Sequence, residues 1–154
     1  MTSWYSKVTS DLSAIPDFIS HYEGELAAAR SEVKIFGNIE KNLTVLPGLV
    51  EERFSQLQEV EGVLEYLNIQ HGKIRQKHFK KYLEGYQRSL SAREADKYVD
   101  GEEEVVDFML IINEVALVRN KYLAIIKGLE SKGFVLNNIT KLRTAGMEDI
   151  VLGN

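Results

Sequence analysis

Apolar residues recur at intervals of three and four positions along most of the chain, which is the period of an amphipathic α-helix. The first series begins near Pro16, a residue that suits the first turn of a helix. Its apolar members, spaced as in a coiled coil, are Phe18, Tyr22, Leu26, Ala29, Val33, Phe36 and Leu43. Pro47 lacks a backbone N–H, so we expect this first helix to end or kink there.

A second helical segment is predicted from about Pro47 to Tyr86. Its apolar seam consists of Val50, Phe54, Leu57, Val60, Leu64, Leu67 and Ile74. Gly85 stands where this series stops, and a glycine at such a point marks the expected end of the helix.

The third segment opens with Ser91 and Glu94, which have the spacing of a capping box. We expect this helix to extend to about Lys132. Whether it runs in one piece or breaks at Asp100–Gly101 is left open by the pattern, because the glycine there falls inside the series.

Gly133 suits the left-handed position that follows a helix, so a separate short helix is predicted over residues 136–143. The flanks are expected to be flexible over residues 1–15 and loose over residues 144–154. No stretch alternates as a strand does. The sequence therefore predicts an all-α chain, an elongated helical hairpin or bundle with coiled-coil character, whose single domain spans residues 16–143.

Composition is that of an ordinary globular protein, with 44% apolar and 27% charged residues. The chain has no cysteine, which excludes a disulfide framework, a thiolate zinc site and a cysteine nucleophile. Its most apolar stretch, residues 105–129, contains five charged side chains and is therefore no membrane helix. We expect a cytoplasmic protein without a membrane partner.

The stretch 105–129 is apolar on nearly every side of a helical wheel, so it requires burial on several sides. The large apolar residues outside its main face are Leu110, Ile111, Leu117, Val118 and Ile125. A closed bundle within one chain could cover them. Association with further copies accounts better for the surplus, to which the apolar residues between 134 and 142 add.

Basic residues are concentrated in one segment of a chain whose formal net charge is −4. Residues 73–88 contain one acid, Glu84, and six basic side chains, namely Lys73, Arg75, Lys77, Lys80, Lys81 and Arg88. All but Arg75 fall within about 100° of arc on a helical wheel, opposite the cluster of Phe79, Tyr82, Leu83, Tyr86 and Leu90. Such a stripe suits the phosphates of a nucleic acid and does not read base sequence.

The same stripe has a plainer interpretation. Runs of like charge are commonly solvated faces that pair with acids of a neighbouring helix. The candidate acids are Glu102, Glu103, Glu104 and Asp107. Both interpretations stay open at the level of sequence.

No pattern in the sequence indicates catalysis, a bound metal or a cofactor. His71 and His78 are seven residues apart, whereas two metal ligands on one helix face are three or four apart. They fit better as polar positions in a helix seam. The chain contains no nucleophile elbow, phosphate-binding glycine loop or dinucleotide fingerprint. We therefore expect a binding protein and not an enzyme.

The C-terminal third carries a family resemblance. Residues Leu123 to Phe134, LAIIKGLESKGF, followed by Ile139 to Arg143, ITKLR, resemble the end of the UvsY-like recombination mediators of T-even-type tailed phages. Upstream, Leu90 to Ala92 and the basic segment that ends in Tyr82 and Gly85 are similar to the preceding stretches of that family.

The resemblance covers about residues 69–143. It implies a helical protein of an infected bacterial cell that forms a homo-oligomeric ring, with seven subunits expected. Its partners would be single-stranded DNA, a single-strand-binding protein and a RecA-like recombinase that it loads onto DNA. In the family a Lys and an Arg two residues apart bind DNA; the Lys corresponds to Lys77, and the Arg position is occupied by Phe79. The family's short C-terminal helix holds the ring, which maps here onto Phe134, Leu136, Ile139 and Leu142.

A rival interpretation belongs to another functional class. The chain would be a helical structural or adaptor protein, such as a phage assembly or scaffolding factor, whose basic stripe meets an acidic protein surface. Titration with nucleic acid separates this interpretation from that of a mediator.

Overall fold

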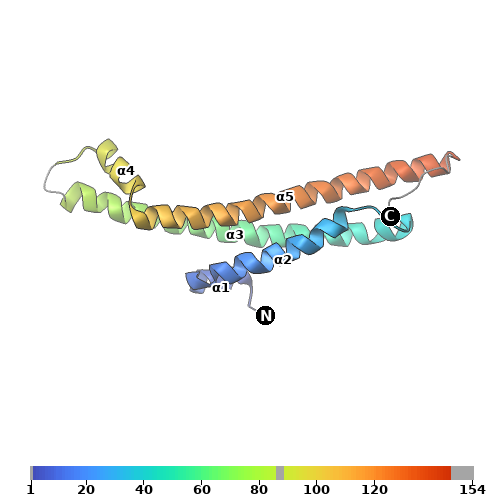
Figure 1. Cartoon of the computed structure of the whole chain (residues 1–154), viewed down its shortest axis with the longest axis horizontal. Coiled ribbons are helices and arrows are strands. Elements are labelled where there is room, and N and C mark those ends of the chain that lie inside the picture. Colours follow the sequence, from blue (N-terminus) through green and yellow to red (C-terminus); the bar gives the residue numbers. More distant parts are fainter. Residues whose placement is uncertain (1, 86–88, 147–154) are drawn as a thin grey trace.

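The computed structural model describes residues 2–85 and 89–146, and every regular element within these ranges is a helix. The elements are α1 (Trp4–Ser10), the 3₁₀ turn η1 (Leu12–Ala14), α2 (Ile15–Val33), α3 (Ile39–Gly85), α4 (Ala92–Asp100) and α5 (Glu103–Thr144). The molecule is elongated, with α3 and α5 running antiparallel along its length and α4 near one end (Figure 1). The predicted all-α class and hairpin are confirmed.

An apolar seam on each of the two long helices holds the hairpin together. The predicted members Leu57, Val60, Leu64 and Leu67 of α3 are all buried. They pack in one core with the buried α5 residues Ile112, Val115, Val118, Tyr122, Ile125, Ile126 and Leu129. Both series repeat at three- and four-residue spacing, which keeps the two seams facing each other along the rod.

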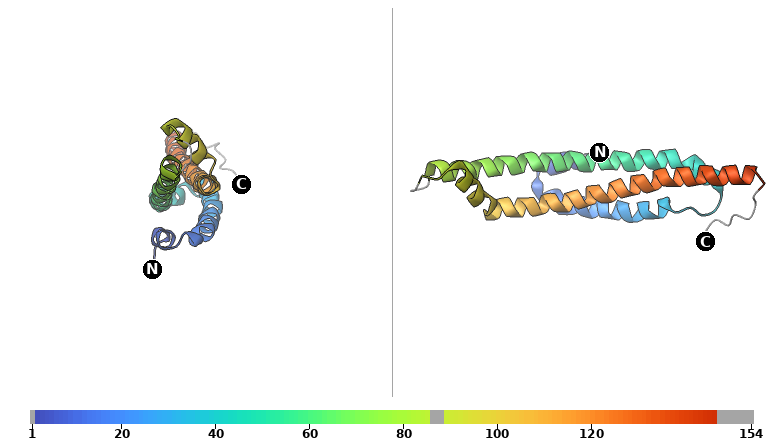
Figure 2. Two further views of the ribbon diagram at one scale, coloured as in Figure 1. Left: turned by 90° about the vertical axis from the view of Figure 1, so that its left-hand side faces the viewer. Right: turned by 90° about the horizontal axis from the view of Figure 1, so that it is seen from above.

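The helix α2 lies beside the middle of this hairpin, where it packs on α5 and reaches α3 through side-chain contacts (Figure 2). Its buried residues include the predicted series Phe18, Tyr22, Leu26 and Ala29. The Tyr22 hydroxyl donates to Glu59 of α3 at 2.7 Å, and Lys121 of α5 donates to Glu23 at 2.6 Å. These two polar contacts, one with α3 and one with α5, fix the position of α2 along the hairpin.

Pro47 neither ends nor kinks the first helix in the way that the sequence suggested. The chain breaks earlier, between α2 and α3, where Gly37 adopts a φ of 77° and the Asn38 side chain accepts from the Lys41 N–H at 3.2 Å. Pro47 lies inside α3. Proline has no N–H to donate to the carbonyl of Leu43, four residues earlier. Pro47 and Leu43 are both exposed, so water can donate to that carbonyl instead.

The predicted separate C-terminal helix is also wrong, because α5 continues through Gly133 to Thr144 without interruption. Gly133 has a packing role and no capping role. A Cβ at this position would lie 3.0 Å from a methyl carbon of Leu46, so the missing side chain lets α3 approach α5. The helix begins at Glu103, and the sequence break considered at Asp100–Gly101 is real.

Helical structure is present between residues 4 and 15, where the sequence predicted a flexible flank over residues 1–15. Ser3 caps α1 by accepting from the Ser6 N–H at 3.1 Å. Val8 is fully buried, and the Trp4 ring meets Phe18 edge-on at 6.2 Å. The helix α1 therefore packs on α3, and η1 contacts α1 and α2. Burial of apolar side chains such as Val8 favours this arrangement.

Other helix boundaries agree with the sequence. Pro16 lies in the first turn of α2, and α3 ends at Gly85. Ser91 and Glu94 form both hydrogen bonds of the predicted capping box at the start of α4. No helix in the described part of the chain is both long and apolar enough to cross a membrane. Of the predicted C-terminal tail, residues 147–154 lie outside the described residues.

Candidate nucleic-acid interface

The open part of the predicted basic stripe is formed by Lys73, Lys77 and Lys80, near the end of α3 that carries α4. All three are exposed and form no ion pair or hydrogen bond within residues 2–85 and 89–146. Their spacing of four and three places them on one side of the helix. Unpaired ammonium groups in a row can contact successive phosphates of a flexible strand.

Arg75 belongs to a different surface. Its guanidinium pairs with Asp100 and lies 3.9 Å from the Asp96 carboxylate, both on α4. Because these two acids neutralise its charge, Arg75 serves to hold α4 against α3. Arg88, the last residue of the predicted stripe, lies outside the described residues.

Three side chains of α3 contact the carboxylate of Glu102 at this end of the rod. Its carboxylate accepts from the Tyr82 hydroxyl, lies 3.5 Å from the Lys81 ammonium and lies 3.7 Å from Nδ1 of His78. The hydrogen bond from Tyr82 is the main cause that lowers the pKa of Glu102, and the nearby charges of Lys81 and His78 add to it. Glu104 completes the contact, with 2.7 Å between its carboxylate and Nε2 of His78.

The basic segment is therefore divided between the two interpretations of its sequence. Arg75, His78 and Lys81 meet acids of α4 and α5, as the plainer interpretation expects. Of the four acids proposed for that pairing, Glu102 and Glu104 take part, whereas Glu103 and Asp107 make no ion pair with the residues described. The three remaining lysines form the open stripe.

Aromatic side chains near the stripe are turned toward α4. Tyr82 is half-buried and stacks on Tyr98 of α4 with the ring centroids 5.3 Å apart. Phe79 is also half-buried, and Leu90 is buried, whereas Leu83 is exposed and Tyr86 lies outside the described residues. The role of α4 was not predicted from the sequence, where the acids at positions 96 and 100 were the available signal.

The histidines fit the seam positions predicted for them. His71 is buried and stacks on Phe108 at 6.2 Å, and His78 joins the acids that begin α5. Within the described ranges, no group of three or more His, Cys, Asp or Glu side chains is placed to hold a metal ion.

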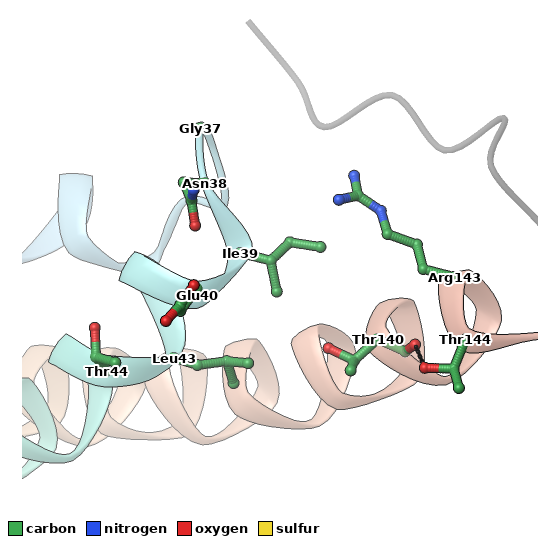
Figure 3. A pocket seen from close by; sticks show the side chains of 9 residues that line it. All are labelled: Gly37, Asn38, Ile39, Glu40, Leu43, Thr44, Thr140, Arg143 and Thr144. Carbon is green, nitrogen blue, oxygen red and sulfur yellow. Dashed lines mark hydrogen bonds between the residues drawn. The ribbon is translucent and has the colours of Figure 1, made fainter.

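A hollow of about 590 Å³ lies at the opposite end of the rod (Figure 3). Its lining comes from the start of α3, including Ile39, and from the last turns of α5, including Arg143. Thr144 donates to the Thr140 carbonyl at 2.9 Å beside it. The lining offers no nucleophile paired with a base, so it suggests no reaction.

The residues predicted to hold an oligomer differ in their surroundings. Phe134 is 70% exposed and Leu142 is exposed, whereas Ile139 is half-buried. Leu136 is completely buried within the chain, so its assignment to a surface between subunits is wrong. The assignment followed from the expected separate short helix, whereas Leu136 belongs to the continuous α5.

Comparison with protein-family models, characterised proteins and solved structures finds no match to this chain.

Proposed function

We propose that this chain is a recombination mediator, which binds single-stranded DNA without sequence preference as a homo-oligomer. The observation that carries the proposal is the row of exposed ammonium groups of Lys73, Lys77 and Lys80, which form no ion pair with any described residue. The resemblance of residues 69–143 to the UvsY-like mediators supports it. In this role the protein helps to load a RecA-like recombinase onto DNA that a single-strand-binding protein covers.

Binding through a few lysines per subunit is weak, and a ring or other oligomer compensates for this by multivalency. Each additional stripe on the same assembly binds the strand at a high effective concentration. The proposed ring, with seven subunits expected from the resemblance, would therefore hold DNA tightly by many replaceable contacts. Such contacts suit a protein that must later release the strand to a recombinase.

The test is fluorescence anisotropy of a labelled oligothymidine over a range of salt concentrations. We expect binding with a log–log salt slope of about −0.7 for each phosphate contacted. The double variant Lys77→Glu/Lys80→Glu should abolish it. The matched control is Lys34→Glu/Lys41→Glu, which changes the net charge equally at exposed residues far from the stripe along α3.

A second candidate function is supported by the ion pairs at the same end of the rod. Because Arg75, His78 and Lys81 already meet acids, the basic segment also suits a structural or adaptor protein that binds no DNA. Wild-type protein that fails to bind oligothymidine even at low salt would favour this candidate. Equal loss of binding in both double variants would likewise count against a DNA site on the stripe.

A further inference from the structure

One face of α5 is apolar and uncovered along the half nearest α4. Val106, Leu110 and Leu117 lie on it, and the two leucines are 56% and 59% exposed. Asn113 and Asn120 lie between and after them and are exposed as well. The intervals from residue 106 to 120 are four, three, four and three, which is the seam of a two-stranded coiled coil.

The described chain packs on other sides of α5. The opposite side of the helix carries Val115 and Tyr122, which are completely buried in the core. The helix α2 approaches from the flank, where Glu23 binds Lys121 at 2.6 Å. The helix α4 packs chiefly on α3 (Figure 2). Two large leucines in this seam, exposed to this degree, indicate a surface that another helix covers.

Charge along this face indicates what that helix is. Beside this face lie the exposed acids Glu103 and Asp107 near the start of α5, and the basic residues Lys121 and Lys127 further along the helix. A parallel copy of α5 would bring the acids of both copies together. An antiparallel copy places the acidic end of each helix beside the basic end of the other, so the face is complementary to itself.

We propose that this face of α5 binds a second copy of the chain, with the two α5 helices antiparallel and a two-fold axis close to Asn113. Leucines of the two seams then cover each other, and Asp107 of each copy lies beside Lys121 of the other. An ammonium has three donors, so Lys121 can keep its bond to Glu23. Glu114, which is exposed, comes close to the axis and faces its own counterpart.

The proposal rests on the proposed function for one point, namely that copies of the chain associate. It adds which surface they use, the exposed face of α5, and that the contact is two-fold. A two-fold contact closes after two copies. A ring therefore needs a second contact between different surfaces. The exposed Phe134, on the far half of α5, remains available for it.

The test uses the absence of cysteine from the chain, which lets a single introduced thiol report one distance. With a short bismaleimide, Asn113→Cys should cross-link to itself, because the axis brings the two copies of this position together. Val106→Cys should not, since its two copies lie about 20 Å apart along an antiparallel pair. A mixture of Val106→Cys and Asn120→Cys should give the mixed dimer.

The alternatives predict different results. A parallel pair would cross-link at each of the three positions alone, and a partner other than a second copy would cross-link at none. Either result would overturn the proposal, as would a monomer mass by light scattering. Because binding of oligothymidine is measured separately at the α3 lysines, loss of DNA binding with the expected cross-links would reject only the proposed function.

Two substitutions without thiols test the same contact by its strength. Leu110→Lys should raise the dissociation constant of the pair by more than about tenfold, because it removes a buried leucine. Glu114→Gln should lower it about twofold by removing the repulsion at the axis. Circular dichroism checks that both variants remain folded; weaker association of folded Glu114→Gln would contradict the two-fold geometry.

Discussion

Arg53 of α3 and Glu32 of α2 form a two-pronged ion pair in the interior, with Nε 2.9 Å and Nη2 2.5 Å from the two carboxylate oxygens. Arg53 is only 3% exposed. Its Nη1 also donates to Glu25 at 2.8 Å and to Gln56 at 2.9 Å. The contacts with Glu32 and Glu25 tie α2 to α3, and the contact with Gln56 lies within α3. The arginine therefore fixes the register of α2 on the hairpin.

Replacement of Arg53 by Ala should destabilise the protein by about 1.5–3 kcal/mol, because it removes the hydrogen bonds to two half-buried carboxylates. Unfolding in urea, followed by circular dichroism, measures the change. Arg30→Ala is the matched control, since Arg30 lies on α2 but is exposed and forms no ion pair within the described ranges. A loss as small as that of the control would show that the network contributes little.

The pH dependence of stability should reflect Glu25. The hydrogen bond from Gln56, and after it that from Arg53, holds the pKa of this carboxyl below its usual 4.5. A carboxyl with a lowered folded pKa stabilises the protein above its unfolded pKa, and this stabilisation is lost as the pH falls through the folded value. Glu25→Gln should therefore be less stable than wild type near pH 7.

The difference should shrink as the pH falls below about 4.5, where the carboxyl of the unfolded wild type takes up a proton before that of the folded protein does. Urea unfolding at several pH values measures it. Glu51→Gln removes a charge from an exposed position of α3 and serves as the control. A difference for Glu25→Gln that stays constant from neutral to acidic pH would contradict the assignment.

Apolar spacing predicted the helices and their buried faces but could not place every break between them. The buried series of α2 and the α3 seam around Leu57 follow directly from three- and four-residue intervals. The same intervals continue through Phe36 and Leu43, so the series conceals the turn at Gly37. Pro47 offered a stronger local signal than Gly37, yet its exposed position lets α3 continue through it.

Long-range polar contacts could not be predicted from the sequence at all. Arg53 finds its carboxylates 21 and 28 residues away, and no local pattern distinguishes it from the solvated arginines of the chain. The basic stripe was predictable as a cluster. Which of its basic residues pair with acids and which stay open could not be predicted, because the pairing of Arg75 with Asp100 depends on how α4 folds back across α3.

This division yields a prediction for the salt dependence of DNA binding. Lys77→Ala should reduce the magnitude of the log–log salt slope by about 0.7, the value for one lost phosphate contact on a single strand. Arg75→Ala should leave the slope unchanged, because Asp100 and Asp96 already hold its charge. Anisotropy titrations at four or more salt concentrations distinguish the two. A slope change for Arg75→Ala alone would place the DNA on the α4 side.

Removal of the acid next to the stripe should strengthen DNA binding. Glu102 lies 3.5 Å from Lys81 and close to His78, so its charge lowers the attraction of this region for phosphate. Glu102→Gln should bind oligothymidine about threefold more tightly at low salt, an effect of the size expected for one exposed charge pair. Glu103→Gln removes the same charge next in sequence, where no ion pair forms within the described chain. Weaker binding by Glu102→Gln would mean that the acid orders the site.

Two glycines should respond to alanine with opposite signs. A Cβ on Gly128 of α5 would lie 2.9 Å from a methyl carbon of Val33, at the end of α2, whereas a Cβ on Gly24 would meet nothing within 4 Å. Overpacking costs about 1–3 kcal/mol, and alanine in a helix regains up to about 1 kcal/mol. Gly128→Ala should therefore be destabilising and Gly24→Ala stabilising, as measured by urea unfolding.

A double variant tests the cause. Because the clash is with Val33, combining Val33→Ala with Gly128→Ala should cost less stability than the sum of the two single changes. Additive effects would indicate that the end of α2 does not pack closely on α5.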